Sequence, residues 1–218
     1  MVQESRDRKR IDILGDRLRA TREAYGISLR ELARRVGVSA SLISQIETGK
    51  VHPSVSTLYS LASELDASVD ELLFEDAPLA SRADGSLWDA LTDHPHIEPV
   101  QRSSDRTVIE LGSGVRWERL TTRSVPGFDF LNVVYQPGAT SGLDTMQRHP
   151  GYEWGYVVEG KFNVTLGHEE HILEPGDSIA FDSMVPHRLH NDGDIEVRAI
   201  WFVLGWQSER PVPPGSDQ

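Results

Sequence analysis

The sequence predicts a protein of two domains: an all-α domain of five short helices, followed by an all-β domain folded as a small barrel. Apolar residues recur at helical spacing up to about residue 74, and from residue 108 short β-branched and aromatic runs alternate with Pro, Gly and Asp turns. Helix and strand breakers fill the stretch between them. We therefore expect an N-terminal arm (1–10), a helical domain (11–74), a linker (75–107), a barrel domain (108–207) and a flexible tail (208–218).

The helical domain is predicted from serines that can cap helices and from glycines that end them. The first helix carries Leu14 and Leu18 and ends at Gly26. The second spans residues 28–36 and opens with a capping box, in which Ser28 and Glu31 would bond each other's backbone N–H groups. The remaining three are expected at residues 39–47, from residue 54 through 65, and at 69–74.

Composition excludes several classes of protein. The 218 residues include no cysteine, so neither disulfides nor thiolate metal sites can form. No apolar run approaches the roughly 20 residues that cross a bilayer, and the start MVQESRDRKR lacks the apolar core of a signal peptide. We expect a cytoplasmic protein with no membrane partner.

Charge is unevenly distributed along the chain, whose formal net charge is −12. Residues 6–50 hold eleven Lys and Arg against six Asp and Glu, a net +5. Residues 77–218 hold eleven against twenty-one, a net −10. A basic N-terminal region on an acidic protein suggests that this region binds a polyanion.

The second and third helices form a predicted helix-turn-helix, because a turn centred on Gly37 allows two short helices to meet at a steep angle. Residues 28–39 (SLRELARRVGVS) and 42–50 (LISQIETGK) resemble the lambda-repressor-like (XRE) family, and the similarity extends over residues 11–74. The resemblance implies sequence-specific binding of double-stranded DNA, with the third helix in the major groove. It also implies a structural ion pair between Arg22 and Glu47.

The same resemblance assigns the DNA contacts. Four residues would face base edges, with Gln45 able to make a bidentate contact to adenine: Ala40, Ser41, Ser44 and Gln45. Four others would contact phosphates, which position the protein without reading sequence: Ser28, Arg30, Ser39 and Lys50. Glutamines that read bases in the family are partly replaced here, so the operator sequence does not follow from the motif.

The barrel domain is predicted from seven strand-like runs, at residues 108–111, 117–122, 128–135, 154–158, 162–166, 179–181 and 197–204. Two motifs lie among them: Gln147-x-His149-x3-Glu153-x6-Gly160, and residues 175–177 (PGD) followed after eight residues by Pro186-His187-x3-Asn191. As a pair they resemble the cupin superfamily, whose fold is a small double-stranded β-helix barrel.

The cupin resemblance places four polar side chains in the barrel interior as a ligand-binding site: Gln147, His149, Glu153 and His187. The two histidines and the carboxylate form the set that suits Fe(II), Mn(II), Ni(II) or Zn(II), with Gln147 as a poorer fourth ligand. The alternative is a hydrogen-bonding pocket that requires no cofactor. The other histidines are expected in loops or at the surface: His52, His94, His96, His168, His171 and His190. Trp154 and Tyr156 should point out of the barrel if Glu153 points in.

An XRE domain joined to one cupin domain resembles bacterial transcriptional regulators that respond to metabolites. We therefore expect a homodimer that binds a two-fold symmetric operator and changes its affinity when a small-molecule effector binds, rather than an enzyme. The main alternative is a mononuclear iron oxygenase of the same domain order, using His149, Glu153 and His187. A third interpretation is a protein-interaction module of the antitoxin type. Effector, operator and the sign of regulation are not specified by the sequence.

Overall fold

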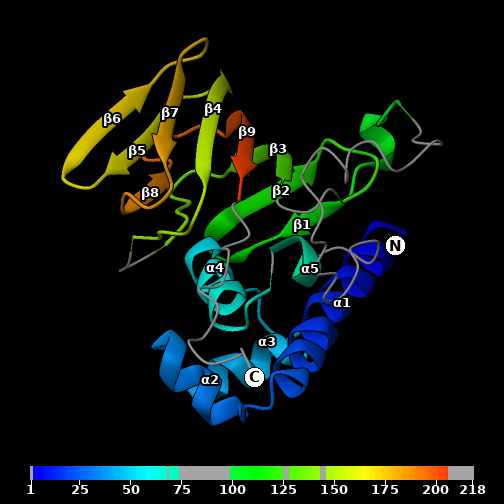
Figure 1. Cartoon of the computed structure of the whole chain (residues 1–218). Helices are drawn as coiled ribbons and strands as arrows, with labels where there is room; N and C mark the ends of the chain where they lie inside the picture. Colours follow the sequence, from blue (N-terminus) through cyan, green and yellow to red (C-terminus); the bar gives the residue numbers. More distant parts are fainter. Residues whose placement is uncertain (1, 68, 74–98, 125–127, 143–145, 206–218) are drawn as a thin grey trace, which may run out of the picture.

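A computed structural model describes residues 2–67, 69–73, 99–124, 128–142 and 146–205. Helices make up one half of the molecule and strands the other, so the predicted fold class is confirmed (Figure 1). Most of the expected linker and all of the expected tail lie outside the described residues. The short 3-10 helix η1 (Ser103–Asp105) leads into the first strand.

The helical half contains α1 (Val2–Ala24), α2 (Leu29–Val36), α3 (Ala40–Glu47), α4 (Val55–Glu64) and α5 (Val69–Leu73). Helix α1 begins at Val2, so it includes residues 2–10, which were predicted as a separate arm. No Pro or Gly interrupts residues 2–14, and most of these residues are tolerated or favoured in a helix. Charge pattern alone therefore misplaced the start of the helix.

Serine caps set the starts of the next three helices. The hydroxyl oxygens of Ser28, Ser39 and Ser54 each accept a backbone N–H three residues ahead, at 3.1–3.2 Å. Gly37 ends α2 in the left-handed conformation, with φ 76°. The capping box is only half formed, because the Glu31 carboxylate bonds to arginines one turn ahead in α2.

Two sheets form the barrel half. The larger has the order β1-β2-β3-β9-β4-β7 and the smaller the order β6-β5-β8, with antiparallel pairing throughout the described strands. The strands are β1 (Val108–Glu110), β2 (Val115–Arg119), β3 (Phe128–Tyr135), β4 (Tyr152–Glu159), β5 (Phe162–Leu166), β6 (Glu169–Leu173), β7 (Ser178–Asp182), β8 (His187–His190) and β9 (Val197–Leu204). A 3-10 turn, η2 (Gly112–Gly114), joins β1 to β2.

Alternation along β4 and β9 separates an inner face from an outer one. In β4, Glu153, Gly155 and Val157 are buried, whereas Trp154 and Tyr156 are exposed. This agrees with the predicted inward direction of Glu153. Strand β6 was not predicted, because most of its residues are exposed and lack apolar alternation.

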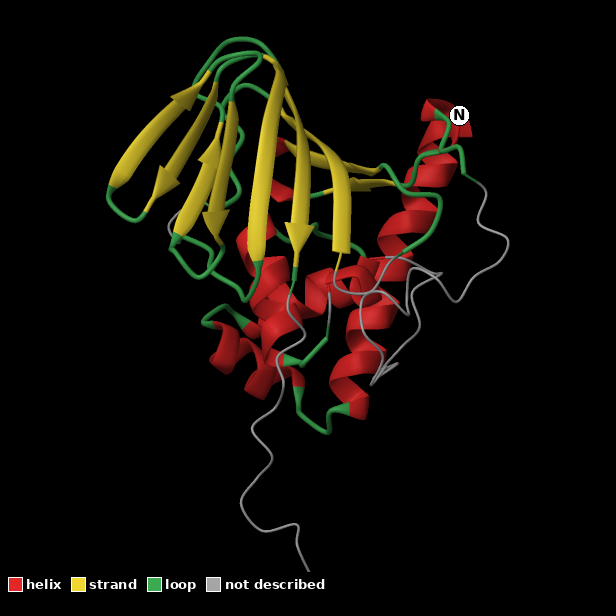
Figure 2. Cartoon of the chain, turned by 45° about the horizontal axis from the view of Figure 1, so that its top comes forward, coloured by secondary structure: helices red, strands yellow, loops and turns green. Residues whose placement is uncertain are grey.

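The two halves share one continuous core rather than being joined only by the linker. The Ser56 N–H at the start of α4 donates to the carbonyl of Ser141 at 2.9 Å. The Gly112 N–H donates to the carbonyl of Pro53 at 2.8 Å. Figures 1 and 2 show the helices covering one end of the strand layers, with α4 next to the strands in Figure 1.

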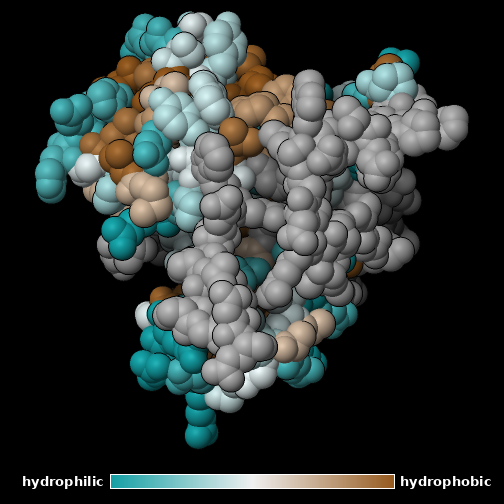
Figure 3. All heavy atoms as spheres, viewed as in Figure 1, coloured by the Kyte–Doolittle hydropathy of each residue, from teal (hydrophilic) through white to brown (hydrophobic). Residues whose placement is uncertain are grey.

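The described surface differs between the halves. In Figure 3 the surface over the helices at the bottom is mainly hydrophilic, whereas apolar patches interrupt the surface over the strands. Within the described part of the chain, no helix is both long and apolar enough to cross a membrane.

Candidate functional site

The first candidate site is the exposed side of the helix-turn-helix. The side chains predicted to meet bases lie on α3, where Ser41, Ser44 and Gln45 are exposed and Ala40 is half-buried. The opposite side of α3 is buried through Ile43 and Ile46. The four residues predicted to contact phosphates are also exposed: Ser28, Arg30, Ser39 and Lys50. The eight predicted DNA-contact residues thus have the exposure that DNA binding requires, except that Ala40 is half-buried.

A buried ion pair holds α3 against α1. The Nε of Arg22 lies 2.6 Å from Oε1 of Glu47, and its second terminal nitrogen lies 3.1 Å from Oε2. A third donor on Arg22 reaches the carbonyl of Ile27 at 3.1 Å. Hydrogen bonding to Glu47 raises the pKa of Arg22, against the opposing effect of burial. This is the ion pair that the family resemblance implied, and it fixes the orientation of α3 against α1.

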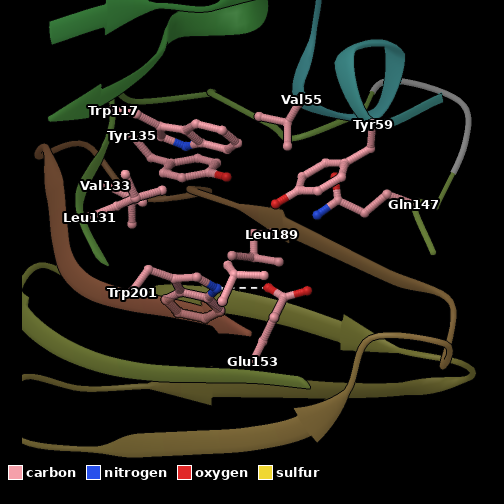
Figure 4. A pocket seen from close by; sticks show the side chains of 11 residues that line it. Val55, Tyr59, Trp117, Leu131, Val133, Tyr135, Gln147, Glu153, Leu189 and Trp201 are labelled. Atoms are coloured by element: carbon pink, nitrogen blue, oxygen red, sulfur yellow. Dashed lines mark hydrogen bonds between the residues drawn. The ribbon is translucent and has the colours of Figure 1, made fainter. Parts of the chain in front are cut away.

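The second candidate site is a small chamber inside the barrel, closed on one side by α4 (Figure 4). Its free volume is about 20 Å³. Polar groups meet at one end of the chamber and apolar side chains surround the rest. The lining comprises Val55, Tyr59, Trp117, Leu131, Val133, Tyr135, Gln147, Glu153, Leu189, Trp201 and Val203.

Three of the predicted ligands converge at the polar end. Oε1 of Glu153 lies 3.0 Å from Nε2 of His149 and 3.1 Å from Nε2 of His187. All three side chains are buried, and His187 is completely inaccessible. Gln147 lies alongside, because its backbone forms an antiparallel bridge with His187. The structure therefore brings together all four residues that the cupin resemblance selected.

Neighbouring groups fix how these side chains are oriented. Nδ1 of His187 lies 2.8 Å from the carbonyl oxygen of Val185. Because a carbonyl can only accept, Nδ1 carries the hydrogen and a neutral ring presents the lone pair of Nε2 to the chamber. Nδ1 of His149 lies 3.4 Å from the carbonyl oxygen of Pro150, so its hydrogen also points at a backbone carbonyl and its Nε2 lone pair points the other way. The indole N–H of Trp201 donates to Oε2 of Glu153 at 2.7 Å, which leaves Oε1 directed at the histidines.

Electrostatics keep the site anionic. Burial raises the pKa of Glu153, but hydrogen bonds and positive charge from His149 and His187, when Nε2 carries a hydrogen, lower it by more, so that its pKa lies well below the usual value. Burial and the nearby Glu153 charge both raise the pKa of Tyr135. Near neutral pH the chamber therefore holds an ionised carboxylate beside an un-ionised phenol.

The donor set fits a divalent transition metal. Among the described residues, Nε2 of both histidines, Oε1 of Glu153 and Oε1 of Gln147 are buried without a hydrogen-bond partner of good geometry. With the Nδ1 hydrogens directed at backbone carbonyls, lone pairs face one another at about 3 Å. Two ligands at right angles around an ion at about 2.1 Å are also about 3 Å apart. A cation would satisfy this arrangement, and His149, Glu153 and His187 would hold it.

Comparison with known proteins agrees with both halves of the molecule. The helix-turn-helix family model matches residues 18–72, and the cupin domain model matches residues 131–203. The chain is 31% identical to the HTH-type transcriptional regulator PuuR of Escherichia coli K12 over 179 residues, which are 81% of this chain and 86% of PuuR. The chain belongs to the HTH-type transcriptional regulators.

Two further similarities were found, one in sequence and one in fold. The HTH-type transcriptional regulator SinR of Bacillus subtilis 168 is 36% identical over 102 residues, covering 45% of this chain and 90% of SinR. An HTH_3 family transcriptional regulator from Vibrio cholerae has the same fold, with a TM-score of 0.62 at 22% identity, covering 91% of this chain and 98% of that one.

The four other histidines that the structure describes do not belong to the His149–Glu153–His187 cluster. His168 is exposed at a turn, and His171 is half-buried on β6. His52 is half-buried in the loop before α4, and His94 and His96 lie outside the described residues. His190 differs from expectation: it ends β8, and its side chain is only 14% exposed beside Asp192. The segment around Thr140, whose backbone bridges His190, accounts for the low exposure.

Sequence reasoning missed several chamber residues of the regulator. Trp201, which orients Glu153, and the aromatic residues Trp117 and Tyr135 come from β9, β2 and β3, three neighbouring strands of the larger sheet. Tyr59 comes from the helical domain, and its ring stacks on His149 with centroids 4.0 Å apart and planes 2° apart. Alternation along β9 could have indicated Trp201, but no local signal relates Tyr59 to His149, 90 residues away in the sequence.

Proposed function

We propose that this transcriptional regulator is a ligand-responsive, sequence-specific DNA-binding protein rather than an enzyme. In this proposal α3 reads an operator, and the barrel chamber binds a small-molecule effector through a divalent transition metal. Binding in the chamber changes operator affinity. The observation that carries the proposal is the buried cluster of His149, Glu153 and His187, whose Glu153 also lines a chamber that Tyr59 of the helical domain closes.

The DNA-binding part rests on the exposed side of α3. Gln45 presents an amide that can bond both the N6 and N7 edge of adenine, and Ser44 beside it can donate or accept. Arg30 and Lys50 supply positive charge at exposed positions, where phosphates can be contacted. A monomeric recognition helix covers only a few base pairs, so we propose a homodimer on a two-fold symmetric operator.

The outer face of β4 supports a homodimer. Trp154 is 40% exposed and Tyr156 is 50% exposed, on a strand in the middle of the larger sheet. Trp154 also contacts Phe202 of β9, with ring centroids 5.3 Å apart, so the aromatic surface extends across two strands. Contiguous aromatic side chains of this kind are enriched at protein interfaces.

The effector-binding part rests on the composition of the chamber. One end offers metal ligands, and apolar residues such as Leu131 and Val203 line the rest. A small ligand with a metal-binding acidic end and a compact apolar part is complementary to this arrangement. In the absence of a metal, the same side chains would act as a hydrogen-bonding pocket.

A mononuclear iron oxygenase is the second candidate, because two histidines and one carboxylate are the ligands of non-haem Fe(II) oxygenases. The intact exposed face of α3 and the similarity to PuuR favour regulation instead. Oxygen uptake by the Fe(II)-loaded protein, measured with small organic acids and phosphonates, separates the two candidates. Substrate-dependent oxygen consumption would favour the enzyme.

Metal content tests the proposed centre. Untagged full-length protein, His187→Ala and the surface control His168→Ala are analysed by elemental mass spectrometry. We expect about one transition-metal ion per chain in the wild type and in His168→Ala, and loss of the ion in His187→Ala. If no metal accompanies the wild type and none binds on addition of Co(II), Zn(II), Mn(II) or Fe(II), the metal centre is refuted.

A further inference from the structure

The roof of the barrel chamber belongs to the DNA-binding half of the molecule. Val55 and Tyr59 lie one turn apart on α4 and point into the chamber opposite Trp201 and Glu153 (Figure 4). Val55 is fully buried there. The Tyr59 ring stacks flat on the His149 ring, and it packs edge-to-face with Trp117, with ring centroids 6.3 Å apart. One metal-ligand candidate is thus covered by a side chain of the helical domain.

The same helix is built into the helix-turn-helix domain. The other side of α4 buries Leu58, Leu61 and Ala62 in the helical core. Near its end, Oε1 of Glu64 lies 2.9 Å from a terminal nitrogen of Arg35 on α2. Helix α2 packs in turn against the recognition helix α3. A displacement of α4 therefore changes the support of the helices that contact DNA.

The chamber is too small for a metabolite while this roof is in place. Its free volume of about 20 Å³ admits roughly one water molecule or a single ion. Pockets for small organic ligands have volumes of about 300 Å³ or more. The strands around the chamber are held by continuous hydrogen-bonded pairing, whereas α4 joins the barrel through side-chain packing and single backbone bonds such as Ser56 to Ser141. Of the elements around the chamber, α4 is therefore the one that can move to enlarge it.

We propose that the effector site is composite, with Tyr59 of the DNA-binding domain as its roof, and that effector binding displaces Tyr59 from His149 and moves α4. This inference rests on the proposed function of the chamber. It assigns to Tyr59 a ligand-contacting role and makes it the link between the barrel and the recognition helix. The protein can exist with Tyr59 stacked on His149 or displaced from it, and a ligand shifts this equilibrium only by the difference in its affinity for the two states. The stability of the Tyr59–His149 contact therefore sets how strongly the protein responds to the effector.

The test is a double-mutant cycle on the full chain, read by hydrogen–deuterium exchange of α4 amides in metal-free buffer. Tyr59→Ala and His149→Ala should each accelerate exchange by about 2- to 12-fold, the contribution of one stacked aromatic pair. The double variant should be no faster than the faster single variant, because both remove the same contact. Ser63→Ala, at an exposed position of α4, should leave exchange unchanged.

Two results would refute the contact between Tyr59 and His149, whether or not the barrel holds a metal. One is an acceleration of exchange in the double variant equal to the product of the two single effects, and the other is an unchanged exchange rate in Tyr59→Ala. Co(II) then tests transmission, with binding followed by visible absorption. Co(II) is small enough to fit beneath the roof, so it should bind both the wild type and Tyr59→Ala. It should slow α4 exchange only in the wild type, because coordination fixes the His149 ring on which Tyr59 stacks. An equal response in both proteins, or none in a wild type that binds Co(II), contradicts transmission through Tyr59. Failure of the wild type to bind Co(II) refutes the metal centre. The metal-free double-mutant cycle still tests whether Tyr59 contacts His149.

Discussion

Gly155→Ala is expected to disable the metal centre without altering any of its ligands. A methyl group at this position would lie 2.1 Å from Cζ3 of Trp201. Two further atoms of the same ring, Cη2 and Cε3, would lie 2.5 and 2.6 Å away. An ordinary contact begins at 3.4 Å, so the indole must retreat by about 1.3 Å. Trp201 is buried between Phe162 and Phe181, which leaves little space for this movement.

Two effects follow from the displaced indole. Overpacking of a filled core costs about 1–3 kcal/mol of folding free energy. The indole N–H also leaves Oε2 of Glu153, and loss of such a supporting hydrogen bond typically weakens metal binding by about 10- to 100-fold. We therefore expect a lower midpoint in urea and a Co(II) dissociation constant raised by this factor, as measured by visible absorption.

Trp201→Phe is the matched comparison, because it keeps an aromatic ring in place but removes the N–H donor. It should reproduce the loss of Co(II) affinity with no overpacking. Co(II) binding by Gly155→Ala at wild-type affinity, in a protein that is folded by circular dichroism, would refute the assigned role of Trp201 in orienting Glu153.

Three further outcomes test the helical half. Glu47→Gln should lower the free energy of unfolding by about 3–5 kcal/mol in urea titrations, because it leaves the buried Arg22 charge without its partner; a loss below 1 kcal/mol would contradict this. Gln45→Ala should weaken binding to an operator selected from random duplexes by about 1–3 kcal/mol, and relax specificity at one base pair; a uniform loss on all sequences would instead indicate a phosphate contact. The Glu31 carboxyl should titrate by NMR with a pKa of about 2, mainly because Arg34 donates hydrogen bonds to it. Its contribution to stability should therefore be present above about pH 4.5 and disappear towards pH 2. An unchanged pKa of Glu31 in Arg34→Ala would refute this cause.

Much of the helical half follows from local chemistry. Ser28, Ser39 and Ser54 cap helices because a hydroxyl at that position bonds an otherwise unpaired N–H, and the sequence shows this directly. Gly37 is required where the backbone turns left-handed. The start of α1 was misplaced because a charged segment without breakers suits a helix as well as an extended arm.

The barrel shows where local chemistry is insufficient. The spacing of His149 and Glu153 within one motif, and of His187 in the second, was enough to bring the three together by resemblance. Strand β6 escaped prediction because it lies at the edge of the smaller sheet and its exposed residues lack the apolar alternation that marks a strand. The contact of Tyr59 with His149 depends on how two domains pack, and no periodicity within either domain encodes it.

The central claim is that the occupancy of the barrel sets operator affinity. The most direct measurement is the dissociation constant for a selected operator duplex, by fluorescence anisotropy at fixed ionic strength, with and without saturating Co(II), for wild type and His187→Ala. We expect Co(II) to change the wild-type constant by about 5- to 150-fold, the usual range of allosteric coupling, and to leave His187→Ala unchanged. Identical wild-type affinities with Co(II) bound and absent would contradict the claim.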